Sequence, residues 1–111
     1  MIDANDAGDA GRENNYMDNY QLYITSAVNN DVEKDANMAI AVNDAVIRFN
    51  SHDWGELCEE DKTANDTDLK NRDGHVLGKY PTPKGYIYIN LYFNDISLNS
   101  DVACIMYPSE Y

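Results

Sequence analysis

The chain has 111 residues, with 20 acidic against 8 basic side chains, so its formal net charge is −12. A chain of this length builds one domain around a single modest core. So acidic a surface repels nucleic acid and anionic membranes and attracts basic partners, which argues against direct nucleic-acid or membrane binding. No apolar run approaches the roughly 20 residues that span a bilayer, and the N-terminus lacks the pattern of a signal peptide. We therefore expect a cytoplasmic protein.

Residues 1–15 are small, polar and acidic, which predicts a flexible tail ahead of a single domain over residues 16–111. Residues 20–26 predict a short strand, although their alternation is imperfect. Apolar positions recur at three- and four-residue steps from residue 31 to 50, which predicts a helix with its N-cap at Asn30-Asp31. The face expected to be buried consists of Val32, Ala36, Ala39, Ile40, Val46, Ile47 and Phe49.

Residues 57–71 predict a second, shorter and very polar helix, in which Leu57, Ala64 and Leu69 are available for burial. After a turn at 72–74 the period changes to two, which predicts strands at 75–80, 86–93 and 102–107. Residues 81–85 form the loop of the first hairpin. The expected fold is therefore a two-layer α+β domain, with N-terminal helices packed on a small antiparallel meander at the C-terminus.

The segment 53–73 holds a dense set of carboxylates that is relieved by few basic residues. On a helix, these side chains project over neighbouring turns and build a negative ridge suited to a groove that binds DNA phosphates. The alternative is an ordinary solvated helix face. The candidate partner-binding residues are Asp53, Trp54, Glu56, Glu59, Glu60, Asp61, Asp66, Asp68 and Asp73.

Two aromatic features offer further contact surfaces. Trp54 follows a helix end, where it is expected to cap the core with its indole N–H hydrogen-bonded; the alternative is an exposed anchor at an interface. In the strand 86–93, the tyrosines at 86, 88 and 92 share one face, and the isoleucines at 87 and 89 share the other. The isoleucine face is expected to meet the helix, which leaves the tyrosine face for a protein partner.

Four residues suit a metal: His52, Cys58, His75 and Cys104. No two of them have the short spacing of zinc motifs, so we expect no cofactor and keep zinc as the alternative. Cys58 with His52 or His75 also suggests a nucleophile and its base, but the carboxylates around Cys58 disfavour a thiolate. The sequence has no Gly-rich phosphate loop and no HExxH motif, and nothing singles out an acid–base pair. We therefore expect no enzymatic activity.

Residues 51–66 run Ser-His-Asp-Trp-Gly-Glu-Leu-Cys-Glu-Glu-Asp-Lys-Thr-Ala-Asn-Asp. This block resembles a family of small acidic bacterial proteins of plasmids, integrative elements and phages, which shows GDWG-(D/E)-x-x-E-E-D-K-x-x-N-(D/E). That family continues with L-x-x-Y and ends in (F/Y)-P-x-E-Y, here Leu77–Tyr80 and Tyr107–Tyr111, so the resemblance covers residues about 38 to 111. His52 stands where the family has Gly, and residues 90–100 differ from its Thr-rich final hairpin.

The resemblance implies a biological context, because mobile elements carry many small acidic proteins that disarm host restriction or CRISPR defences. Together with the charge, it favours a non-enzymatic inhibitor of a host defence nuclease in the bacterial cytoplasm. The specific hypothesis is an anti-CRISPR protein that binds a basic surface of a type II CRISPR effector and blocks DNA loading. The alternatives are a zinc-stabilised binding module and a plasmid-maintenance or antitoxin-like partner protein.

Overall fold

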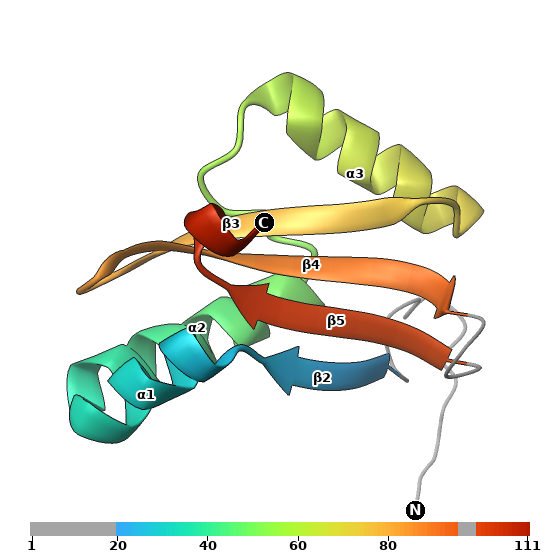
Figure 1. The fold of residues 1–111 in the computed structure, drawn as a ribbon. Helices are drawn as coiled ribbons and strands as arrows, with labels where there is room; N and C mark the ends of the chain where they lie inside the picture. Colours follow the sequence, from blue (N-terminus) through green and yellow to red (C-terminus); the bar gives the residue numbers. More distant parts are fainter. Residues whose placement is uncertain (1–19, 96–99) are drawn as a thin grey trace, which may run out of the picture.

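The computed structural model describes residues 20–95 and 100–111 and has an α+β fold, as the sequence predicts. Figure 1 shows a sheet with helices α1 and α2 on one side and helix α3 alongside strand β3. The expected tail at residues 1–15 lies outside the described residues. In chain order the elements are β2 (Tyr20–Ile24), α1 (Ser26–Lys34), α2 (Ala36–Asn50), α3 (Glu59–Asn71), β3 (His75–Thr82), β4 (Gly85–Asp95), β5 (Ser100–Met106) and a 3-10 turn (Pro108–Glu110).

The sheet has four strands in the order β2-β5-β4-β3. The predicted antiparallel meander of β3, β4 and β5 is confirmed. The early strand, whose pairing the sequence left open, makes the sheet mixed, because β2 joins β5 in parallel, from Tyr20 opposite Asp101 to Ile24 opposite Ile105. The chain leaves β2, passes through the helices to the far edge of the sheet, and returns strand by strand to β2. This pairing brings together segments about 80 residues apart, which no local pattern specifies.

The predicted helix over residues 31–50 is two helices. The first begins five residues earlier, at Ser26, where the Thr25 hydroxyl accepts the Val28 N–H at 3.4 Å. Asp35 then interrupts it with an extended backbone (φ −143°), and the Asp35 carboxylate accepts the Asn37 N–H at 2.9 Å. One aspartate therefore ends α1 and caps α2.

The expected burial of Phe49 in α2 is confirmed, but the rest of the buried face differs from the expected one. The side chains that face the sheet are Met38, Val42, Ala45 and Phe49, while Ile40 is 59% exposed and Ile47 is 56% exposed. Both stripes have helical spacing, so the choice between them depends on where the sheet lies. On the sheet, the expected burial of Ile87 and Ile89 in β4 is confirmed.

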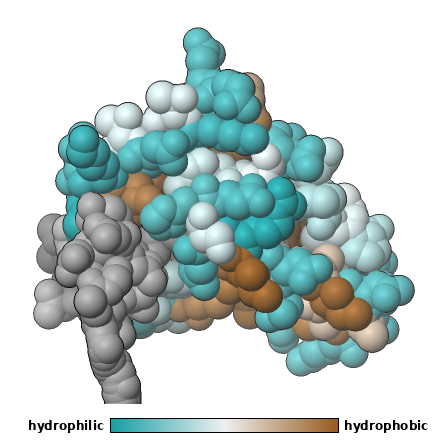
Figure 2. Space-filling model, turned by 180° about the vertical axis from the view of Figure 1, so that it is seen from behind, coloured by the Kyte–Doolittle hydropathy of each residue, from teal (hydrophilic) through white to brown (hydrophobic). Residues whose placement is uncertain are grey.

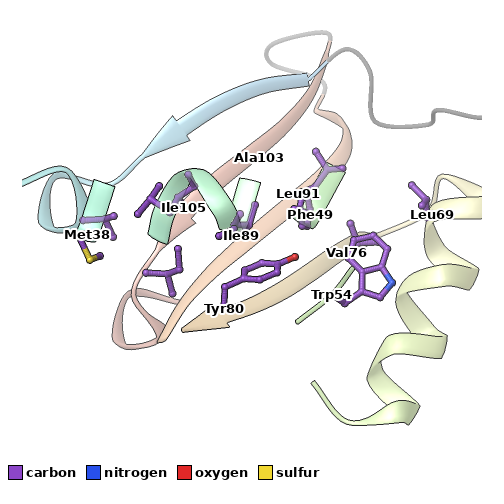
Figure 3. Packing of buried hydrophobic residues seen from close by; sticks show 14 residues of the cluster. Met38, Phe49, Trp54, Leu69, Val76, Tyr80, Ile89, Leu91, Ala103 and Ile105 are labelled. Carbon is purple, nitrogen blue, oxygen red and sulfur yellow. The ribbon is translucent and has the colours of Figure 1, made fainter. Parts of the chain in front are cut away.

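The core lies between α2 and one face of the sheet (Figure 3). Tyr80 is 1% exposed, and its ring lies over Gly78, where any Cβ would meet the phenol. The Tyr80 hydroxyl donates to the Asp53 carbonyl oxygen at 2.8 Å, so the core reaches into the segment that follows α2. That segment begins the carboxylate-rich stretch over residues 53–73, which we call the acidic block.

Candidate functional site

The acidic block begins with a carboxylate that stabilises the fold. Asp53 accepts hydrogen bonds from Arg48 Nε at 2.7 Å and from the Gly55 N–H at 3.0 Å. The Arg48 guanidinium and the Gly55 amide lower the pKa of Asp53 below its usual range. Asp53 is therefore paired with a residue of α2, and its charge is largely neutralised before any partner approaches.

Trp54 packs in the core. It is 2% exposed, its ring makes an edge contact with Phe49 at 5.5 Å, and its indole N–H donates to Asp66 Oδ1 at 2.8 Å. Figure 3 shows the indole nitrogen pointing toward α3. The interpretation of Trp54 as a packing residue is confirmed, and the assignment of Trp54 as a partner contact is wrong, because a buried ring cannot reach a partner. Asp66 serves to hold this ring.

Three residues of the block attach it to the outer edge of β3: Trp54, Glu56 and Asn65. The Asn65 side chain donates to the Leu77 carbonyl at 2.8 Å and accepts the Leu77 N–H at 3.2 Å. Two residues further on, the Lys79 N–H donates to the Trp54 carbonyl, and the Glu56 N–H donates to the Lys79 carbonyl. These bonds cover backbone groups that an edge strand otherwise offers to other chains. They also fix α3 against the sheet.

His52 occupies a left-handed backbone conformation, with φ at 63°. Such a conformation costs a residue with a side chain roughly 1–2 kcal/mol, and Gly adopts it freely. The family that the block resembles carries Gly at this place in its motif. In this chain the imidazole stacks on Trp54, with ring centroids 5.8 Å apart.

We predict that His52→Gly is more stable than His52→Ala by about 1 kcal/mol. Both variants lose the stacked ring, and only the alanine variant retains a Cβ in the left-handed conformation. Urea unfolding of the two proteins measures the difference. Equal free energies of unfolding would mean that this position is not strained.

The remaining carboxylates of the block make no contact that the fold requires. We call them the acidic ridge: Glu56, Glu59, Glu60, Asp61, Asp68 and Asp73, of which all but the half-buried Asp68 are exposed. Glu59 lies 3.6 Å from Lys62 Nζ, a surface ion pair of small energy. The other five side chains have no hydrogen bond or ion pair with any part of the chain that the structure describes. Figure 2 shows that hydrophilic residues dominate the upper part of the molecule, where α3 lies.

The nearby arginine is turned away from this ridge. Arg72 caps α3 in the left-handed conformation and reaches Asp101 at the start of β5, with its Nη2 at 2.6 Å from Asp101 Oδ2. Its guanidinium lies 5.0 Å from the centre of the Phe93 ring. Within α3, Lys62 and Lys70 are the basic residues that offset the ridge. The predicted concentration of negative charge is thus exposed on α3 and its flanks.

The structure does not bring the four candidate metal ligands together. His52 stacks on Trp54, Cys58 is exposed just before α3, and His75 begins β3, where it stacks on Tyr92. Cys104 lies in β5, and burial raises the pKa of its thiol. Across residues 20–95 and 100–111, no three His, Cys, Asp or Glu side chains are grouped so that they could hold a metal ion. The geometry therefore gives the zinc alternative no support.

The tyrosine face of β4 is partly covered by the end of the chain. The ring of Tyr111 meets that of Tyr88 edge-on at 5.5 Å, and its hydroxyl lies 3.3 Å from His75 Nε2. Tyr86 and Tyr92 stay 41% and 47% exposed. The sequence reasoning assigned no role to Tyr111 or to Asn65, although both positions belong to the motifs that carry the resemblance.

The C-terminal segment is tied to α1 through Tyr107. Its hydroxyl donates a hydrogen bond to Asp31, and its backbone N–H donates to Glu110 Oε1 at 2.9 Å. Burial, the hydrogen bond to Asp31 and the negative charges of Asp31 and Glu110 raise the pKa of Tyr107 to about 12. The neutral phenol is therefore favoured in the folded protein.

The free energy of unfolding is expected to fall as the pH rises from about 10, the ordinary tyrosine pKa, toward 12. The contribution of Tyr107 is fully present below that range, because its pKa is higher in the folded than in the unfolded chain. Tyr107→Phe should lower stability at neutral pH and flatten the alkaline decline. Burial also raises the pKa of Tyr80, so part of the decline remains. Urea unfolding across this pH range tests the prediction, and identical slopes for the two proteins would contradict it.

Comparison of the chain with protein-family models, with curated proteins and with solved structures gave no match. Among the described residues, no helix has both the length and the apolar character needed to cross a bilayer. The geometry of the acidic block is therefore the main basis for assigning a function.

Proposed function

We propose that the protein is a non-enzymatic inhibitor that binds a basic, nucleic-acid-binding surface of a host defence nuclease through the acidic ridge. The more specific proposal is an anti-CRISPR protein that binds a type II CRISPR effector and blocks the loading of DNA. The observation that carries it is that some carboxylates of the acidic block stabilise the fold and others are exposed and unpaired. Asp53 and Asp66 hold the fold, while Glu56, Glu60 and Asp61 are exposed without a partner among the described residues.

The charge density of α3 limits how such a protein inhibits. A helix of 13 residues is about 20 Å long. It carries five carboxylates and two lysines, whereas duplex DNA presents about 12 phosphates over the same length. The ridge therefore does not reproduce a duplex. It matches a local group of lysines and arginines, and it competes with the few phosphates that those side chains would bind.

Electrostatic attraction of this kind acts on both rate and affinity. The net charge of −12 steers the chain toward a cationic groove, and salt screens the contact because the ridge is solvent-exposed. At physiological ionic strength the screening length is about 8 Å, so only charges close to the ridge contribute strongly. Binding should therefore weaken steeply as salt is added.

Isothermal titration calorimetry with a reconstituted, guide-loaded type II effector tests the proposal. We expect a complex at low ionic strength whose dissociation constant rises at least about tenfold between 50 and 200 mM salt, as expected for a contact that replaces several phosphates. The absence of a complex with several such effectors would contradict the specific proposal. A basic protein of another kind, recovered on the wild-type chain and lost with the ridge, would then point to the plasmid-maintenance or antitoxin-like alternative.

A further inference from the structure

The acidic ridge borders a cavity that the sequence reasoning did not anticipate. A pocket of about 250 Å³ lies between α3 and β3. Two carboxylates, Asp61 and Asp68, line it from the helix. Leu57 and Leu77 supply apolar walls, and His75 and Tyr111 supply aromatic ones. Negative charge, apolar surface and aromatic rings thus surround one small volume.

We infer that this pocket is a binding site for the side chain of an arginine from a protein partner. The inference rests on the proposed function for the kind of partner, and it adds the residue that the partner inserts. Arginine combines an apolar stem with a planar cation that has five N–H donors and no acceptor. The apolar stem matches Leu57 and Leu77, and the cation matches the carboxylates of Asp61 and Asp68.

The two carboxylates share a face of α3 because seven residues, or two turns, separate them, a rise of about 10 Å along the axis. Neither side chain has a hydrogen bond or ion pair with the rest of the described chain. A cation between them would interact with both. Charge-assisted pairs of this kind are the stronger hydrogen bonds in proteins, and guanidinium–carboxylate pairs are the most directional of them.

The walls are held in place before any ligand arrives. The two hydrogen bonds between Asn65 and the Leu77 backbone set the separation of α3 from β3. Tyr111 is positioned by His75 and by the ring of Tyr88, yet it remains 61% exposed, so its ring is accessible to a cation. A preformed pocket loses less entropy on binding than one that must be assembled.

The chain already binds guanidinium groups in this way within its own fold. Arg48 is paired with Asp53, and its guanidinium lies 5.3 Å from the centre of the Tyr80 ring. Arg72 is paired with Asp101, and its guanidinium lies 5.0 Å from the centre of the Phe93 ring. Each of these sites combines a carboxylate with an aromatic ring. The pocket offers the same combination with no arginine of the described chain in it.

The test is an NMR titration of the full chain with N-acetyl-arginine amide, with the neutral isostere N-acetyl-citrulline amide as the matched ligand. We expect saturable shifts at the Ala64, Leu77 and Tyr111 amides, with the citrulline compound binding at least about tenfold more weakly. The variant Asp61→Asn/Asp68→Asn should weaken the arginine compound by a similar factor. Glu59→Gln/Asp73→Asn removes the same charge outside the pocket and should change binding less than about twofold.

Several results would overturn the inference: no saturable shift with the arginine compound, equal binding of the citrulline compound, or equal losses in the two double variants. These outcomes are separable from failure of the proposed function, since the titration needs no nuclease. If the arginine compound did not bind the pocket, the proposed contact through the acidic ridge would still stand. Conversely, arginine binding without any nuclease complex would retain the pocket and remove the nuclease as the partner.

Discussion

Replacing Gly55 by alanine should destabilise the protein by about 3–5 kcal/mol, a large part of the stability of a domain of this size. Gly55 has φ at +79°, a conformation that costs an alanine roughly 1–2 kcal/mol. The added Cβ would also collide with the carbonyl oxygen of Lys79, to which the Glu56 N–H donates. The added Cβ is fixed to the backbone of residue 55 and meets the backbone of Lys79, so no side-chain rotation removes the clash. The block would have to separate from β3.

Gly74→Ala is the matched control for this prediction. Gly74 has a similar φ of +71°, but the atom nearest to its hypothetical Cβ is 4.0 Å away, at Asp68 Oδ2. The Gly74 variant should be destabilised only by the left-handed backbone conformation, by about 1–2 kcal/mol. Urea unfolding compares the two variants. A Gly55 variant no less stable than the Gly74 variant would mean that the contact with Lys79 does not fasten the block to the sheet.

Replacing Glu59, Glu60 and Asp61 together by lysine should weaken partner binding at least about 100-fold. The three residues lie in the first turn of α3, on the ridge, and reversal places three positive charges against a basic surface. Like-charge contacts at an interface cost several kcal/mol. The same substitutions also place lysines at the positive end of the helix dipole, which costs about 0.3–1 kcal/mol for each residue.

Two further variants separate lost charge from lost stability. Glu59→Gln/Glu60→Gln/Asp61→Asn removes the negative charges without adding positive ones, and it should weaken binding at least about tenfold with less effect on stability. Reversing Asp3, Asp6 and Asp9 changes the net charge as much as the lysine variant does, at positions outside the described residues. If this control loses binding as strongly as the ridge variant, net charge rather than the ridge governs the interaction. Thermal unfolding of each variant checks that the fold is retained.

Local pattern was sufficient for much of the fold. The alternation of Tyr86 to Phe93 predicted both the strand and the face of it that is buried. The polar helix over 57–71 and the two hairpin strands also lie where they were predicted, to within a few residues. In each case, the period of the side chains and the flanking turn residues carry the signal.

Two of the three differences between prediction and structure have their cause in long-range contacts, and the third is local. The apolar stripe chosen for α2 had helical spacing, but the sheet contacts the neighbouring stripe through Met38 and Val42. Aspartate is favoured both at an N-cap and in the first turn of a helix, so Asp35 fitted one continuous helix and the break between α1 and α2 was missed. The parallel pairing of β2 with β5 depends on strands that are far apart in sequence. Such pairings are decided by the assembled core.

The candidate site was predicted in part. The sequence identified the acidic block, but composition alone could not separate the carboxylates that hold the fold from those on the ridge. Asp66 has the Trp54 indole within hydrogen-bond reach and Asp68 does not, a difference that depends on packing. The pocket was also out of reach, because it requires Tyr111 to fold back beside His75, 36 residues away along the chain.

Much of the motif that carries the resemblance is now explained by the fold. Asp53 is paired with Arg48 of α2, and the Trp54 indole is bonded to Asp66 of α3. Gly55 and Asn65 both contact β3. The motif therefore describes how the block is folded and attached to β3. The function proposed here depends on the ridge that this arrangement exposes.

The most direct test of inhibition through the ridge is an order-of-addition DNA-cleavage assay with a reconstituted, guide-loaded type II CRISPR nuclease. Wild-type protein should inhibit when it is added before the target DNA and lose most of its effect when it is added afterwards. The variant Glu59→Gln/Glu60→Gln/Asp61→Asn should inhibit weakly in either order of addition. Inhibition that does not depend on the order of addition, or full inhibition by the ridge variant, would contradict a block of DNA loading by the acidic ridge.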